Sequence, residues 1–204
     1  MLLHLGLRRG ELLALPVDAV KRERIDGRYR YWLDVRINPY QEDSRSSVPS
    51  IKTVSSIRQI PVTGKTAALI QLYIENYRGK PNHSYLINST RNLPMSVEGL
   101  GKLLQQLSKS LPSSVQQIME DRLHTRRISA HNLRHTCAVA RLSQMLAAGT
   151  DMAESIQALR IYFGWSETSH MPQRYARAAF EHRLSSVWND SFDDHIQFVR
   201  GLPG

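Results

Sequence analysis

The sequence predicts a mainly helical α+β fold with a small three-stranded antiparallel sheet. Two observations lead there: a segment near residue 30 and two shorter ones after residue 50 have the character of strands, and nearly everything later has helical periodicity. A chain of 204 residues can bury a real core, and it has no internal repeat or long linker, so one domain is expected.

The predicted sheet comes from the first third of the chain. Within Tyr29–Arg36 the odd-numbered positions carry Tyr, Tyr, Leu and Val, and charged residues occupy most even positions, as in a half-buried strand. Residues 51–53 and 56–62 predict two further short strands joined by a turn at 54–55. The polar segment 38–50 contains two prolines and predicts a loop.

Helices are expected both before and after these strands in the sequence. A short helix at Gly10–Leu15 is stopped by Pro16. The sequences Ser114–Gln117 and Asp151–Glu154 have the form of capping boxes, which start helices. The later helices are expected at residues 66–77, 96–108, from 114, 131–148, from 151 to before Gly164, and 176–188.

The charge of the chain indicates a polyanionic partner. The formal net charge is +9 and the isoelectric point is near 10.0, which favours nucleic acid first and an anionic membrane surface second. No stretch approaches the ~20 apolar residues that a membrane span needs, so no membrane insertion is expected. The single cysteine, Cys137, excludes an internal disulfide and fits a reducing cytoplasm.

Three residue types in the second half suggest phosphate chemistry. Arg134 can clamp a phosphate, His131 can move a proton or hold an oxygen, and Tyr175 offers a hydroxyl nucleophile. His131 and His135 stand four residues apart, as in some zinc sites, but the sequence shows no third ligand. Neither a metal nor another cofactor is therefore expected.

Four sequence blocks resemble, in this order, the catalytic domain of the tyrosine recombinases, the phage-integrase family. The resemblance covers residues 5 to about 180. The blocks are Leu5–Leu15, Lys52–Val62, His131–Thr136, and Leu159–Trp165 together with Arg174–Ala176.

The resemblance implies a role for each block. Arg8 and Arg134 would bind the scissile phosphate and neutralise the charge of a pentavalent transition state. Tyr175 would attack the phosphorus, leaving a 3′-phosphotyrosine and a free 5′-hydroxyl, and Lys52 would protonate that leaving oxygen. Because the bond energy stays in the phosphotyrosine, the reaction would need neither ATP nor a metal.

The remaining family positions fall on four more residues. His131 would accept the tyrosine proton or hold a phosphate oxygen, and Trp165 could only donate its N–H and pack. Glu11 would support the active-site arginines, and His135 would be structural. Two alternatives stay open. Lys65 is a rival of Lys52 as the general acid, and Tyr162 competes with Tyr175 as the nucleophile. The second arises because Trp165 and Tyr175 are ten positions apart, whereas members of the family often have nine.

The resemblance also implies an organisation and partners. The catalytic domain would span residues 1–180 with a truncated first helix, and residues 181–204 would form a helical tail that docks on a neighbouring protomer. The amino-terminal domain that clamps DNA in the family would be absent. The partners would be double-stranded DNA and further copies of the chain, in a tetramer on DNA, within a bacterial cytoplasm and associated with the nucleoid.

Three functions fit these features. The first is site-specific DNA strand exchange, as by the integrase of a mobile element. The second is a type IB topoisomerase-like activity, which shares the chemistry but relaxes supercoils. The third is a truncated, inactive remnant that still binds DNA through its basic surface.

Overall fold

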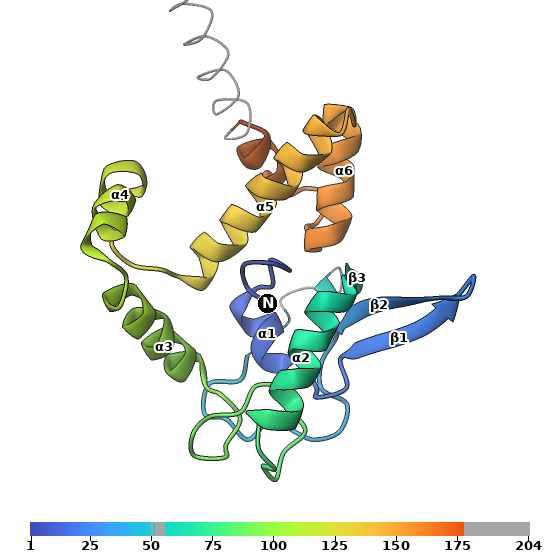
Figure 1. Cartoon of the computed structure of the whole chain (residues 1–204), viewed down its shortest axis with the longest axis vertical. Helices are drawn as coiled ribbons and strands as arrows, with labels where there is room; N and C mark the ends of the chain where they lie inside the picture. The colour runs from blue at the N-terminus through green and yellow to red at the C-terminus, as the bar shows by residue number, and fades with distance from the viewer. Residues whose placement is uncertain (50, 52–55, 178–204) are drawn as a thin grey trace, which may run out of the picture. The chain divides into compact units, whose positions relative to one another are not determined.

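The computed structural model describes residues 1–49, 51 and 56–177 (Figure 1). These residues fall into two compact units. The first consists of Met1–Cys137 together with Tyr162–Trp165, and the second of Ala138–Ile161 together with the residues from Ser166 onward. The sheet and most of the residues of the candidate site belong to the first unit.

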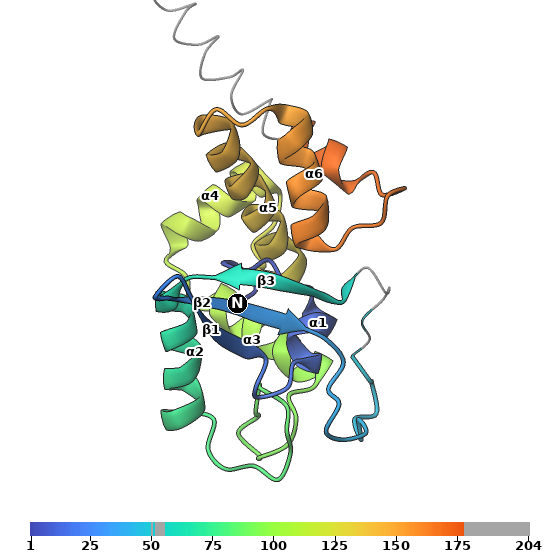
Figure 2. The same cartoon turned by 90° about the vertical axis from the view of Figure 1, so that its right-hand side faces the viewer.

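The sheet consists of β1 (Val20–Ile25), β2 (Arg28–Val35) and β3 (Arg58–Val62), all antiparallel and in that order (Figure 2). The predicted three-stranded antiparallel sheet is thus confirmed, but the prediction of its strands was partly wrong. Ile51 is not in a strand, and residues 52–55 lie outside the described part of the chain.

The strand β1 was not predicted from the sequence, because its interior carries four consecutive charged residues, which give no apolar alternation. It is ordered instead by its pairing with β2, from Val20 opposite Leu33 to Ile25 opposite Arg28. The two strands are joined by Asp26 and Gly27, whose φ angles of 49° and 75° suit a tight hairpin turn.

One face of the sheet forms the core of the first unit. Leu33, Val35 and Ile60 are fully buried there. Helix α2 (Gly64–Asn76) follows β3 directly and contributes Ile70 to this core, and a Cβ built on Gly64 would lie 3.6 Å from the ring of Tyr31. The short helix α1 (Arg9–Ala14) contributes Leu12 and Leu13 to this core, and Leu7 and Leu15, just before and after the helix, are buried in the same core. The orientation of α1 is therefore tightly fixed.

The other helices are α3 (Val97–Lys109), α4 (Ser113–Leu123), α5 (Ala130–Ala147) and α6 (Met152–Phe163), and residues 171–177 are also helical. They confirm the mainly helical prediction. None of the helices in the described part of the chain has the length and apolar character that a membrane crossing requires.

The capping predictions had mixed outcomes. Asp151 caps α6, since its carboxylate accepts hydrogen bonds from the backbone N–H groups of Ala153 and Glu154 at 2.7 and 3.4 Å. The capping box predicted at Ser114 is wrong: α4 begins one residue earlier, after Pro112, which cannot supply a side-chain acceptor. Most of the helix predicted at 176–188 lies outside the described residues.

The loop predicted at residues 38–50 is irregular over its described part, 38–49, and it is anchored by one buried arginine. Arg45 donates from Nη1 to the carbonyl oxygens of Leu13 and Met95, at 3.0 and 2.8 Å, and its guanidinium lies 4.3 Å from the ring centroid of Tyr85. Asp43 pairs with the same guanidinium. The segment that leads towards residue 52 is therefore attached to the end of α1.

Candidate active site

The candidate site begins at the amino-terminus of α1, where Arg8 and Glu11 face each other. Arg8 donates from Nη1 to Glu11 Oε1 at 2.6 Å, and its backbone N–H donates to Glu11 Oε2 at 2.8 Å. Arg8 also donates to Ser56 Oγ at 2.9 Å and to the carbonyl oxygen of Gly164 at 3.0 Å. Three segments distant in sequence therefore meet at one guanidinium.

Arg58, the first residue of β3, binds the same carboxylate. Its Nη1 and Nη2 donate to the two oxygens of Glu11 at 3.0 and 3.2 Å, its Nη1 also donates to the carbonyl oxygen of Ser56 at 2.7 Å, and its Nε donates to that of Tyr162 at 2.7 Å. Arg58 lies on the face of β3 that also carries the fully buried Ile60. A carboxylate this deeply buried needs such paired donors, because an unpaired buried charge is very costly.

Arg134, on the second turn of α5, is the third arginine of the cluster. Its side chain donates to the carbonyl oxygens of Gly6 and Phe163 at 2.5 and 2.8 Å, and Nη1 lies 3.6 Å from Glu11 Oε2. Arg8, Arg58 and Arg134 thus surround one buried carboxylate, that of Glu11, which is 1% exposed. We call these four residues the arginine cluster.

Two aromatic rings complete the environment of Arg134. Its guanidinium lies 4.8 Å from the ring centroid of Phe163 and 5.9 Å from that of Trp165. The two rings stack on each other at 4.8 Å with an interplanar angle of 11°. Gly164 adopts a φ of 58° between them, a conformation that favours glycine, and so places both rings on the same side of the chain.

Gly6 is required where Arg134 meets the first block. Its φ is 60°, and a Cβ at this position would lie 2.4 Å from Phe163 Cε1 and 3.1 Å from Cys137 Sγ. Since its carbonyl oxygen accepts from Arg134, the absent side chain lets the backbone approach both the ring and the guanidinium.

The environment of Glu11 changes its acidity. Burial by itself would raise the pKa of this carboxyl. The hydrogen bonds and positive charges of Arg58 and Arg8 outweigh that effect and lower the pKa below its ordinary value. Glu11 therefore stays ionised near neutral pH and holds the arginines by charge as well as by geometry.

The structure brings four of the predicted site residues together in the first unit: Arg8, Glu11, Arg134 and Trp165. His131 is exposed in the first turn of α5, three residues before Arg134, and His135 is half-buried. Among the described residues, no three histidine, cysteine, aspartate or glutamate side chains lie together in a way that could hold a metal ion.

Two predicted residues are not part of the first unit as the structure describes it. Tyr175 belongs to the second unit, where it lies in the helical segment 171–177 and its side chain is fully buried. Lys52 lies outside the described residues, four positions before Ser56. Of the two rivals, Lys65 is exposed near the start of α2, and Tyr162 is a half-buried neighbour of Phe163.

The sequence reasoning missed Arg58 and Ser56 as site residues. A signal for Arg58 was present, because in the alternating strand it shares a face with Ile60 and Val62. An arginine on the buried face of a strand requires a buried acceptor. Glu11 is the carboxylate that meets this requirement.

The cluster has the means to bind an additional oxyanion. Among the described residues, Arg8 Nε makes no hydrogen bond, and the Arg8 side chain is 27% exposed while those of Arg58 and Arg134 are 8% and 7% exposed. A guanidinium that is fixed on one side and open on the other suits a phosphate group.

Two solved structures resemble this chain, and the first of them shows the same fold. XerA recombinase matches with a TM-score of 0.57 and 18% identity, over 91% of this chain and 54% of that chain. The integrase of the transposon Tn1549, in complex with circular intermediate DNA, matches with a TM-score of 0.45 and 20% identity, over 85% of this chain and 50% of that chain. The chain thus spans about half the length of either structure.

A comparison with curated proteins gave no significant match. The family model described as "Phage integrase family", in contrast, matches residues 1–182. This range includes the arginine cluster, Trp165 and Tyr175, and it agrees with the resemblance carried by the four sequence blocks. The chain belongs to the phage integrase family.

Proposed function

We propose that this chain carries out site-specific DNA strand exchange, as the integrase of a mobile element does, by transesterification through a 3′-phosphotyrosine. Membership of the phage integrase family and the recombinase fold support DNA recombination in general. The partner is double-stranded DNA, which agrees with the net charge of +9.

The arginine cluster is the observation that carries this proposal. A buried carboxylate paired with three guanidinium groups is costly to desolvate, and apolar residues of similar volume often stabilise a core as well or better. It is suited to holding arginines in a fixed geometry towards a phosphate. Such preorganised donors need no rearrangement when charge builds on the phosphate oxygens in the transition state.

In the proposed reaction, the hydroxyl oxygen of Tyr175 attacks the scissile phosphorus in line. The bond between phosphorus and the 5′-oxygen breaks, and a phosphotyrosine ester forms. His131 accepts the proton of the tyrosine hydroxyl, and Lys52 donates a proton to the leaving 5′-oxygen. The 5′-hydroxyl of another strand then reverses the step, so that the number of phosphodiester bonds is conserved.

Arg8 and Arg134 bind the non-bridging phosphate oxygens in this proposal, and Trp165 has a packing role. Its ring stacks on Phe163, whose carbonyl oxygen accepts from Arg134, so the indole supports the position of that guanidinium. Arg58 contacts no phosphate and acts as a positioning residue through Glu11. His135 is placed one helical turn after His131, in a structural role.

The assembly follows from the same proposal. Strand exchange requires two duplexes and several active sites, so the chain would act as a tetramer on DNA, through a tail at residues 181–204. That tail lies outside the described residues. The reaction would take place on the nucleoid in a bacterial cytoplasm.

Covalent trapping tests the function directly. Duplexes with randomised sequence and a nick near the scissile position lose the short 5′-hydroxyl fragment after cleavage, which leaves the protein attached to DNA. The expected result is a covalent adduct with the wild-type chain and with Tyr162→Phe, and none with Tyr175→Phe. The reverse pattern would assign the nucleophile to Tyr162.

The competing functions give different results in the same experiment. DNA binding without any adduct, with an affinity that falls steeply as salt rises, would indicate an inactive remnant. Adducts accompanied by relaxation of supercoiled plasmids of unrelated sequence would indicate a topoisomerase-like enzyme. Adducts that form only on a defined subset of sequences support site-specific recombination.

A further inference from the structure

We propose that the projecting end of the β1–β2 hairpin is a second DNA-binding element, which contacts phosphates of the duplex outside the arginine cluster. The inference rests on the proposed action on duplex DNA. It concerns residues that neither the four sequence blocks nor the cluster includes.

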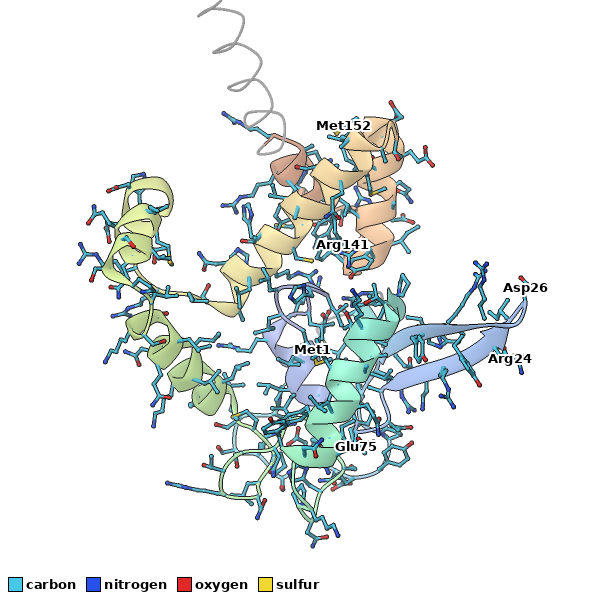
Figure 3. The ribbon with its side chains drawn as sticks, in the orientation of Figure 1. Met1, Arg24, Asp26, Glu75, Arg141 and Met152 are labelled. Carbon is cyan, nitrogen blue, oxygen red and sulfur yellow. The ribbon has the colours of Figure 1, made fainter. Side chains whose placement is uncertain are left out.

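The hairpin extends beyond the rest of the sheet. The strand β3 pairs with β2 only from Val35 to Tyr31, so the residues from Glu23 to Arg30 form a ribbon of two strands, with Arg22 and Tyr31 at its base. Most of these residues are exposed. Figure 3 shows Arg24 and Asp26 at the projecting end of this ribbon. The ribbon buries little apolar surface, and so the hydrophobic core does not explain its length.

The two faces of the ribbon carry different charges. Alternation places Arg22 and Arg24 on one face together with Tyr29 and Tyr31, and that face has no acidic residue. The other face carries Arg28 and Arg30 against one acidic residue, Glu23, which lies directly opposite Arg30. Both faces are therefore positive, and on the first face no carboxylate competes with a phosphate for the two arginines.

One arginine of this basic face lies against an aromatic ring. The guanidinium of Arg22 lies 4.6 Å from the ring centroid of Tyr29, and Tyr29 is 55% exposed. Stacking on an aromatic ring holds an arginine extended while its N–H groups remain available at the edge. An exposed tyrosine hydroxyl beside it adds a further donor for phosphate oxygens.

The shape of the ribbon also fits duplex DNA. A two-stranded ribbon has the width that the major groove admits, and its arginines can reach the phosphates on either side. Val35 pairs with Arg58 and so marks the position of the arginine cluster on β2. Tyr29 lies six residues away along the same strand, a distance of about 20 Å. This corresponds to about six base pairs. The ribbon can thus bind the same duplex beyond the position of cleavage.

Salt-dependent DNA binding tests the proposal. The full chain is titrated with a fluorescent 40-base-pair duplex of random sequence at several salt concentrations, and the slope of log affinity against log salt is compared between variants. In Arg22→Gln/Arg24→Gln the slope is expected to lose about 1.8 in magnitude, since each phosphate contact contributes about 0.9. Arg22→Lys/Arg24→Lys should keep the wild-type slope.

The matched control is Lys80→Gln/Arg91→Gln, which removes two exposed positive charges from other loops. An equal change of slope in the control and the ribbon variant would overturn the proposal, and so would a Lys variant as impaired as the Gln variant. Weaker binding to phosphatidylserine vesicles with unchanged DNA binding would overturn it in favour of a membrane.

Trapping on nicked duplexes separates the two proposals. Adducts formed equally by the wild type and by the ribbon variant, with equal slopes, would refute the ribbon and leave strand exchange intact. A ribbon-dependent slope without any adduct would support the ribbon and refute strand exchange.

Discussion

Glu11 accepts hydrogen bonds from both terminal nitrogens of Arg58, at 3.0 and 3.2 Å, although the two residues are 47 positions apart. One residue belongs to the first turn of α1 and the other to the start of β3. Since Glu11 also binds Arg8 and lies near Arg134, this pair connects the helix, the sheet and α5 at a single carboxylate.

Replacing Glu11 by Gln should destabilise the chain strongly. The amide keeps the size of the side chain but removes the charge, which leaves buried guanidinium groups without their counterion. Loss of one partner of a buried ion pair costs about 3–5 kcal/mol. Chemical denaturation should show a fall of this size in the free energy of unfolding.

Glu23→Gln is the control for this variant, because Glu23 is an exposed glutamate in β1. It should change the free energy of unfolding by less than about 0.5 kcal/mol. Equal effects of the two substitutions would show that the buried carboxylate has no special role in stability.

The contribution of Glu11 should also depend on pH. The folded state lowers the pKa of Glu11, so its carboxylate stabilises the fold above the ordinary glutamate pKa of about 4.3. This contribution is lost as the pH falls through the lower pKa of the folded state. Thermal unfolding between pH 7 and pH 3 gives the melting temperatures of the wild type and of Glu11→Gln. The difference between these two temperatures should narrow as the pH falls. A difference that is constant over this range would contradict the assignment.

Arg58→Lys should separate positioning from binding. Lysine keeps the positive charge but cannot bind both oxygens of Glu11, so the cluster loses its exact geometry while its total charge is unchanged. The rate of covalent trapping should fall by about 10- to 100-fold. The affinity for DNA, measured by fluorescence anisotropy, should remain within about twofold of wild type, because Arg58 touches no phosphate in the proposal.

Arg91→Lys is the matched control for this substitution, since Arg91 is an exposed loop arginine. It should leave both the trapping rate and the affinity unchanged. If Arg58→Lys weakened DNA affinity as much as it slowed trapping, Arg58 would have to be treated as a DNA ligand rather than a positioning residue.

Much of the fold could be predicted because most elements show periodicity or a clear boundary. Pro16 ends α1, Gly149 follows the end of α5, and the apolar stripe of α3 shows in its leucines. The strand β1 gave no such signal, since its stability comes from pairing with β2 and not from a pattern of its own. Local sequence cannot show a strand of this kind.

The site shows a similar division. Arg8, Glu11, Arg134 and Trp165 stand in short sequence blocks that carried the family resemblance, and the structure places them together. The alternation of β3 indicates that Arg58 needs a buried acceptor, but it does not identify Glu11, 47 residues away, as that acceptor. The catalytic roles of His131, Lys52 and Tyr175 remain predictions, because the chemistry depends on their position at a bound phosphate.

Gly6→Ala should disrupt the arginine cluster by changing the backbone that lies against Arg134 and Phe163. Alanine is strained at a φ of 60°, and its Cβ would lie 2.4 Å from Phe163 Cε1, so the ring must move. Phe163 stacks on Trp165 and its carbonyl oxygen accepts from Arg134, so the displacement reaches that arginine. We expect a loss of about 2 kcal/mol or more in the free energy of unfolding, together with slower covalent trapping.

Gly101→Ala makes the same chemical change in a different setting. Gly101 lies inside α3, and a Cβ built there meets nothing within 4 Å among the described residues, apart from its chain neighbours and the backbone of the helix itself. Because alanine favours helices over glycine, this variant should be more stable by about 0.5–1 kcal/mol. Opposite signs of the two changes, measured by urea denaturation, would show that the effect at Gly6 comes from its backbone conformation and the approach of Phe163. A stable Gly6→Ala variant that traps DNA at the wild-type rate would show that Phe163 can move without displacing Arg134.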